Sequence, residues 1–94
     1  MFVLHVEAQL KPASEDALEK TFQSTFYPAI SRQTGFVDAQ LLRPNEANEN
    51  YRLCLSFEKE ALQQKWVATD LHEQVWSEMQ GHFTEFSVTR YTAV

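Results

Sequence analysis

The order of two hydrophobic periodicities constrains the fold of this 94-residue chain more than any other feature of its sequence. Apolar residues at every second position predict a half-buried strand, and apolar residues at every third or fourth position predict an amphipathic helix. Strand spacing occupies residues 2–10, 36–43, 51–57 and 86–92, and helical spacing occupies residues 14–34, 58–68 and 70–80. The predicted order is therefore strand, helix, strand, strand, helix pair, strand.

This order consists of two β-α-β halves, which is the ferredoxin-like split βαβ pattern. Because the crossovers are right-handed, the helices are expected to cover one face of the sheet. The length of the chain is that of a single domain. We therefore expect an α+β fold, with one ferredoxin-like domain over residues 1–94 and a four-stranded antiparallel sheet.

Local signals predict where the first helix begins, bends and ends. Ser14 is expected to act as its N-cap, and Gly35 is expected to stop it. Pro28 cannot donate a hydrogen bond to the carbonyl of Ser24, so we expect a kink at that point.

A break between the two later helices is expected at residues 69–70. Thr69 and Asp70 can each cap the last helix, and Asp70 has the spacing of a capping box with Glu73. Gly81 is expected to close this helix. Its predicted buried stripe is Leu71, Val75 and Met79.

The face of the sheet that points away from the helices has a mixed composition. Its predicted members on the first and third strands are Val3, His5, Glu7, Gln9, Arg52, Cys54 and Ser56. A solvated face would normally carry more charge. We therefore expect a second copy of the chain to cover it, as a homodimer through the sheet face. His5 would then face the partner subunit rather than a pocket.

Charge and targeting signals exclude several classes of protein. The net charge is −5, and the 8 basic residues are scattered singly, whereas nucleic-acid or anionic-membrane binding requires a basic cluster. A single cysteine allows no internal disulfide, which fits a reducing compartment. The N-terminus lacks a basic signal-peptide region, and no apolar run approaches the ~20 residues of a membrane span. We expect a cytoplasmic protein that binds neither nucleic acid nor membrane.

Common cofactor and catalytic motifs are also missing. The three histidines and Cys54 have no metal-ligand spacing, so no metal site is expected. With only two glycines, the chain has no phosphate-binding loop and no nucleophile elbow. We expect neither a bound cofactor nor serine hydrolase, kinase or dinucleotide-binding activity.

Three residues of the stretch WVATDLHEQVW form a W-x-x-[ST]-x-x-H pattern: Trp66, Thr69 and His72. Together with the element order, the Lys-Pro turn after the first strand and the Gly-Phe pair that begins the second, this pattern resembles the antibiotic biosynthesis monooxygenase family. The resemblance implies a dimeric α/β barrel with a pocket between the helices and the sheet of each subunit. It also implies oxidation of aromatic polyketides or quinols by dioxygen without metal or flavin.

The resemblance assigns the catalytic roles to His72 and Trp66. His72 would bind or deprotonate a ring hydroxyl, a task suited to an imidazole, and Trp66 would stack on a flat ligand. Trp76, Phe22 and Phe26 are the candidate substrate-binding residues. The alternative for each is structural: a histidine that bonds the helix terminus, and aromatic rings that only fill the core.

A related branch of the family degrades haem with an asparagine on the first strand, this tryptophan, and a histidine ten residues after it. Here His5 and Trp76 occupy the other two positions, so haem degradation is not expected. An arginine in the family's pocket can hold an oxyanion. The candidates are Arg43, Arg52 and Arg90, and the sequence does not choose among them.

The sequence therefore predicts a cofactor-independent monooxygenase-like protein that acts on a small aromatic, quinol or polyketide-like substrate with dioxygen. The alternative is a non-catalytic protein of the same fold that binds a small ligand or serves as a dimeric accessory subunit. An open apolar cavity beside His72 would favour the first, and a space filled by side chains would favour the second.

Overall fold

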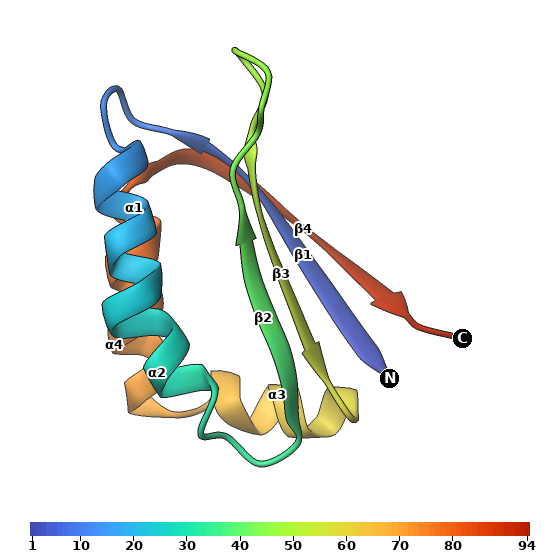
Figure 1. Ribbon diagram of the computed structural model, residues 1–94. Helices are drawn as coiled ribbons and strands as arrows, with labels where there is room; N and C mark the ends of the chain where they lie inside the picture. Colours follow the sequence, from blue (N-terminus) through green and yellow to red (C-terminus); the bar gives the residue numbers. More distant parts are fainter.

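The computed structural model describes residues 1–94. It contains a four-stranded antiparallel sheet with the helices on one side (Figure 1). Its elements are β1 (Phe2–Leu10), α1 (Glu15–Thr21), the π-helical turn η1 (Phe22–Phe26), α2 (Tyr27–Ile30), β2 (Phe36–Leu42), β3 (Tyr51–Phe57), α3 (Glu60–Val67), α4 (Asp70–Gln80) and β4 (Phe83–Thr92). The strand order is β2-β3-β1-β4. The predicted ferredoxin-like α+β fold is confirmed.

The register of the sheet separates an inner face from an outer one. Leu4 on β1 lies opposite Leu55 on β3 and Arg90 on β4, so these three side chains point to the helices. His5 lies opposite Cys54 and Thr89, so its row points the other way. The inner rows of β1 and β3 are buried: Phe2, Leu4, Val6, Ala8, Tyr51, Leu53, Leu55 and Phe57. The predicted facing of both strands is thus confirmed.

The helices fill the inner side of the sheet unevenly. In Figure 1, α1, α2 and α4 stand over one face, and α3 crosses the end of the sheet where β3 finishes. Their buried apolar side chains are Leu18, Phe26, Ile30, Trp66, Val75 and Met79. On β4 only Phe83 is buried, whereas Phe86 and Val88 on its inner row stay exposed. The helix layer therefore leaves this edge strand uncovered.

The first helix differs from the predicted one. Its irregularity lies before Pro28, where the N–H of Tyr27 bonds the carbonyl of Phe22, five residues back, in a π-helical turn. The Ser24 hydroxyl donates to the carbonyl of Lys20 at 2.6 Å within the same stretch. Pro28 itself lies in the first turn of α2, directly after this π-helical turn.

Gly35 does not stop the first helix, so that prediction was wrong. The helix ends at Ile30, and Gly35 has a φ of +82° in the turn before β2. A Cβ atom at Gly35 would lie only 2.3 Å from Cδ1 of Leu62. The glycine is therefore explained by a left-handed backbone and a close approach to α3.

The predicted caps are confirmed in part, and one residue that was predicted to be buried is exposed. Ser14 precedes α1 but its side chain makes no capping hydrogen bond. Thr69, not Asp70, caps α4, so Asp70 and Glu73 form no capping box. Leu71 is 43% exposed, because the buried face of α4 is rotated toward His72 and Trp76.

The outer face of the sheet carries no element of this chain. Arg52 donates to Glu7 across it at 2.8 Å, and the rings of His5 and Tyr91 meet edge to face at 4.9 Å. His5 points away from the helices, as predicted. None of the helices combines the length and the apolar character needed to cross a membrane.

Candidate functional site

A cavity of about 150 Å³ lies between the inner face of the sheet and the corner formed by α3 and α4. Nine of its twelve lining residues are apolar, so its few polar groups dominate its chemistry. These polar residues are Gln63, His72 and Arg90, and the aromatic ones are Phe26, Trp66, Trp76 and Phe86. One wall is the inner row of β4, which the helices leave uncovered.

The corner between α3 and α4 is held by one threonine hydroxyl. Thr69 Oγ1 donates to the carbonyl of Trp66 at 2.8 Å and accepts the backbone N–H of His72 at 3.1 Å. An N-cap side chain accepts from the third N–H of its helix, which places the histidine three residues after the threonine. The W-x-x-T-x-x-H spacing therefore corresponds to two hydrogen bonds, through which the threonine hydroxyl links the backbone of the tryptophan to that of the histidine.

The imidazole of His72 lies between the two indoles of the chain. Its ring centroid is 5.1 Å from that of Trp66, with the planes at 89°, and 6.4 Å from that of Trp76, with the planes at 13°. Burial lowers the pKa of His72 below its usual 6.5, since the charged form loses hydration. At neutral pH the ring is therefore uncharged and able to accept a proton.

Trp76 is the centre of an aromatic cluster that borders the cavity. Its ring lies 6.3 Å from Phe26, 5.9 Å from Phe83 and 5.7 Å from Phe86, measured between centroids. Aromatic pairs at these separations and tilts attract through their quadrupoles. The indole is thus held from both the helix layer and β4.

The structure brings four of the five predicted site residues together. His72, Trp66, Trp76 and Phe26 line the cavity. Phe22 does not; its ring packs on Phe26 at 6.1 Å and on Tyr27 at 5.9 Å, and it is partly buried against the core. Phe22 is therefore placed in the core layer and not in the site.

One polar residue of the cavity, Gln63, was not singled out by the sequence, and another, Arg90, was one of three candidate arginines. Gln63 is 6% exposed, and its Oε1 has no hydrogen-bond partner. Gln63 lies three residues before Trp66, so the two side chains point to the same face of α3. Arg90 follows Val88 on the inner row of β4, and its Nε lies 4.0 Å from the carboxylate of Glu60.

The other candidate arginines lie outside the cavity. Arg52 pairs with Glu7 on the outer face of the sheet. Arg43 pairs with Glu19 in a separate polar groove of about 810 Å³ between α1 and the β2–β3 loop. Of the three arginines, only Arg90 lines the cavity beside His72.

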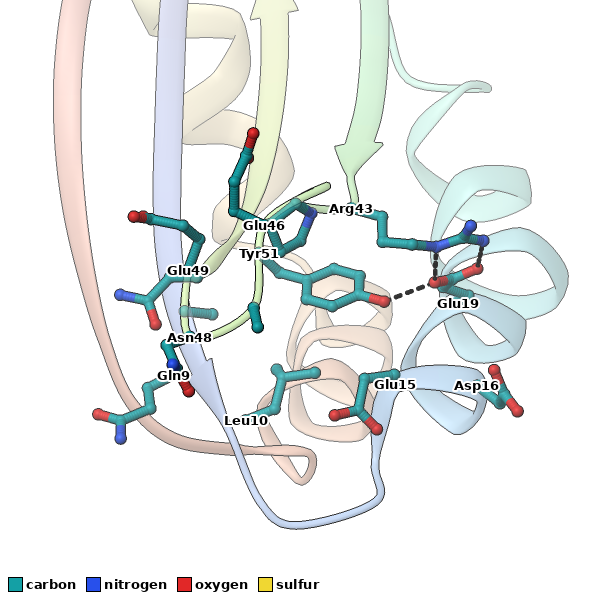
Figure 2. A pocket seen from close by; sticks show the side chains of 14 residues that line it. Gln9, Leu10, Glu15, Asp16, Glu19, Arg43, Glu46, Asn48, Glu49 and Tyr51 are labelled. Carbon is teal, nitrogen blue, oxygen red and sulfur yellow. Dashed lines mark hydrogen bonds and ion pairs between the residues drawn. The ribbon is translucent and has the colours of Figure 1, made fainter.

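The polar groove is organised around one carboxylate. Figure 2 shows Arg43 and Tyr51 directed at Glu19; the Arg43 Nε lies 2.7 Å from Glu19 Oε2, and the Tyr51 hydroxyl donates to the same oxygen at 2.5 Å. The Arg43 guanidinium and then the Tyr51 hydroxyl lower the pKa of Glu19 to about 2. Burial, followed by the neighbouring carboxylate, raises the pKa of Tyr51 to about 12.

Metal ligands do not converge anywhere in the chain. No three His, Cys, Asp or Glu side chains are grouped in a way that could hold an ion. Cys54 lies on the outer face of the sheet, and burial raises the pKa of its thiol, which disfavours the reactive thiolate.

Several solved structures share this fold at low sequence identity. A variant of SnoaB, a cofactor-independent oxygenase from Streptomyces nogalater, has a TM-score of 0.84 at 18% identity, over 98% of this chain and 91% of that one. A MhuD variant with two manganese protoporphyrin IX molecules bound per active site has a TM-score of 0.82 at 23% identity, over 100% and 95%. A conserved protein from Methanosarcina mazei Go1 has a TM-score of 0.82 at 13% identity, over 96% and 89%. At such identities the likeness establishes the fold alone.

The sequence itself carries the stronger evidence of kinship. No curated protein matches the chain significantly. The family profile for antibiotic biosynthesis monooxygenases matches residues 1–77, which include the Trp66–Thr69–His72 corner. Because this match extends over most of the 94 residues, the chain belongs to the antibiotic biosynthesis monooxygenase family.

Proposed function

We propose that this protein is a cofactor-independent monooxygenase that acts with dioxygen on a small phenol or hydroquinone. The observation that carries the proposal is the uncharged His72 imidazole held between two indoles in an otherwise apolar cavity. Family membership supports oxygenase chemistry. The description of SnoaB as a cofactor-independent oxygenase supports the absence of a cofactor here.

The size of the cavity supports a single aromatic ring as the bound group. An apolar cavity of roughly 150 Å³ engineered in another protein binds benzene, and the cavity here is of the same volume. A polycyclic substrate would have to extend outward along the uncovered inner row of β4.

In this proposal some residues of the cavity bind the aromatic ring, and others remove its proton and stabilise the anion that results. Trp66 and Trp76 bind the faces and edges of the ring, and His72 accepts the proton of a ring hydroxyl. The guanidinium of Arg90 stabilises the resulting oxyanion. The ring then supplies four electrons to dioxygen: one oxygen atom is inserted at a ring carbon, the other leaves as water, and a hydroquinone becomes a hydroxylated quinone.

Haem does not fit the same residues. Ligation of haem iron needs a donor such as a histidine nitrogen, and Trp76 stands at the position where the haem-degrading branch has that histidine. An indole N–H can only donate a hydrogen bond. The cavity of about 150 Å³ also favours one ring rather than a porphyrin. We therefore propose no role for haem.

Oxygen consumption tests the proposal. Purified protein is supplied with hydroquinone, methylhydroquinone and 1,4-dihydroxynaphthalene, and His72→Ala and Trp66→Phe are compared with the wild type. Loss of a general base lowers a rate by roughly 10²–10⁴-fold, so His72→Ala should approach the uncatalysed rate. His82→Gln is the matched control, because His82 bonds Thr21 and does not line the cavity. Equal oxygen uptake by the wild type and His72→Ala would refute the assigned role.

We further propose a homodimer through the outer face of the sheet. The mixed face formed by β1, β3 and β4, with its partly buried apolar and aromatic groups, supports this arrangement. Sedimentation should give twice the chain mass at micromolar concentration, and Thr89→Arg, which lies on this face opposite His5, should shift the mass to that of one chain. A wild-type protein that sediments as a single chain would exclude the dimer.

The second candidate function is a non-catalytic binder of small ligands. The apolar lining of the cavity supports it, because nine of the twelve lining residues are apolar and binding a ring without turnover requires only such a surface. Saturable binding of hydroquinone by the wild type, with oxygen uptake no faster than in buffer, would select this candidate.

A further inference from the structure

Gln63 carries a buried polar atom with no hydrogen-bond partner. Its side chain lies on α3 one turn before Trp66, is 6% exposed, and lines the cavity. The amide oxygen Oε1 is shielded from solvent and accepts no hydrogen bond from the chain. No other buried side-chain nitrogen or oxygen is left in this state.

Such an arrangement opposes folding. A buried carbonyl without a donor loses its hydration and gains nothing in return, so buried polar atoms in proteins are nearly always paired. A methionine or leucine at this position would fill the same space without that loss. The carbonyl is therefore best explained by a donor that arrives with a ligand.

The other polar groups of the cavity define what that donor can be. Arg90 can only donate hydrogen bonds, and an uncharged His72 imidazole offers a single acceptor nitrogen. Gln63 Oε1 adds a fixed acceptor on the α3 side of the same apolar space. A ring hydroxyl is a donor that is small enough to accompany one aromatic ring.

We propose that Gln63 is a specificity-determining residue whose Oε1 accepts a hydrogen bond from a hydroxyl group of the aromatic ligand. The cavity would thus select single-ring phenols and hydroquinones over the same rings without a hydroxyl. This inference rests on the proposed aromatic ligand, but it concerns binding and does not require turnover.

Two probes that differ by one hydroxyl test the proposal: 4-methylphenol and toluene. Their dissociation constants are measured without oxygen from the emission of Trp66 and Trp76, the only tryptophans of the chain, which both line the cavity. The ratio of the two constants removes the general hydrophobic contribution. The variant is Gln63→Met, which keeps the length of the side chain and removes the acceptor, and the matched control is Gln64→Met on the exposed side of α3.

The preference for 4-methylphenol over toluene should fall about tenfold in Gln63→Met, the effect of losing one hydrogen bond, and stay within about twofold in Gln64→Met. Ligand-free Gln63→Met should melt no lower than the wild type, because no paired group is lost. An unchanged preference in Gln63→Met, or no binding of 4-methylphenol by the wild type, overturns the proposal.

A measurement on the wild type makes the test independent of how the variant folds. The side-chain carbonyl carbon resonance of Gln63 should shift on addition of 4-methylphenol and stay in place on addition of toluene. Equal shifts with both probes overturn the proposal. Failure of the proposed oxygenase is distinguishable, because it would abolish oxygen uptake while leaving this discrimination in binding intact.

Discussion

The polar groove and the apolar cavity differ in volume and in whether their polar groups already have partners within the chain: the larger one is the more fully paired. The groove between α1 and the β2–β3 loop holds about 810 Å³, but the Glu19 carboxylate at its wall is already bound by Arg43 and Tyr51 (Figure 2). The cavity under α3 and α4 holds about 150 Å³, yet it contains the unpartnered carbonyl of Gln63 and the desolvated imidazole of His72. The smaller cavity is therefore the better candidate for a ligand site, because its polar groups remain available to a ligand.

The largest expected effect is the loss of stability on truncating Trp66, which tests whether this residue of the cavity wall also belongs to the hydrophobic core. Trp66 is 2% exposed, and Trp66→Ala should lower the free energy of unfolding by about 3–5 kcal/mol, as other buried aromatic truncations do. Urea unfolding measures this loss, with Trp66→Phe as the variant that keeps a ring in place. A loss below about 1 kcal/mol would mean that the indole does not support the fold, and that the cavity and the core are separate.

Next in size is the corner that joins the two cavity helices. Thr69→Val removes the hydroxyl that links Trp66 to His72 and keeps the shape of the side chain. Loss of an N-cap costs about 0.5–2 kcal/mol, which thermal or urea unfolding can resolve. Thr69→Ser restores the hydroxyl and should recover most of the stability; if it behaves like valine, the hydrogen-bond chain is not what stabilises the corner.

The pH dependence of stability should separate the cavity from the groove. The pKa of His72 is lowered by burial, so the unfolded chain binds this proton more readily than the folded one. The contribution of His72 to stability is complete above the unfolded pKa of about 6.5 and is lost as the pH falls toward its folded value. In His72→Gln this loss below pH 6.5 should disappear in urea titrations; persistence of the same slope would assign it to another group.

Glu19 should produce a second loss of stability at lower pH. Its pKa of about 2 in the folded chain lies below the ordinary 4.5, so its stabilising contribution is present above pH 4.5 and is lost between pH 4.5 and 2. Glu19→Gln should abolish the loss of stability between pH 4.5 and 2 and leave the loss below pH 6.5, which is assigned to His72, unchanged. If the variant altered both losses of stability, the two regions would not be independent.

The smallest effect is expected from the groove on the cavity. Arg43 is largely exposed, and surface ion pairs contribute little to stability at neutral pH. Arg43→Gln should leave the affinity for 4-methylphenol and any oxygen uptake within about twofold of wild type, the range of a site without contact to the ligand. A large loss of either would make the groove, not the cavity, the place to look for the substrate.

Much of this fold could be predicted because periodicity reports directly on burial. The alternation in β1 and β3 predicted which side chains face the helices, and the register confirms it. The W-x-x-T-x-x-H spacing predicted that Trp66 and His72 belong to one corner, because three-residue steps are local helix geometry. These features depend on neighbours in the chain.

The predictions that were wrong depend on contacts between distant segments. Leu71 shares an apolar stripe with Val75, but the helix packs so that His72 and Trp76 point inward and Leu71 stays exposed. Glycine is common just after the end of a helix, but Gly35 is required instead by the close approach of Leu62 from α3. Periodicity gives the spacing of a buried stripe to within about one residue, and packing decides its centre.

The sequence by itself determined the element order, the inner and outer rows of the central strands, and the hydrogen-bonded corner that carries His72. Only the tertiary structure decided that Arg90 joins this site while Arg43 and Arg52 lie elsewhere, that Phe22 stays outside it, and that Gln63 lacks a partner. The physical reason is the range of the interactions. Strand alternation and helix capping act within a few residues, whereas desolvation and pairing of polar groups depend on which distant surfaces meet.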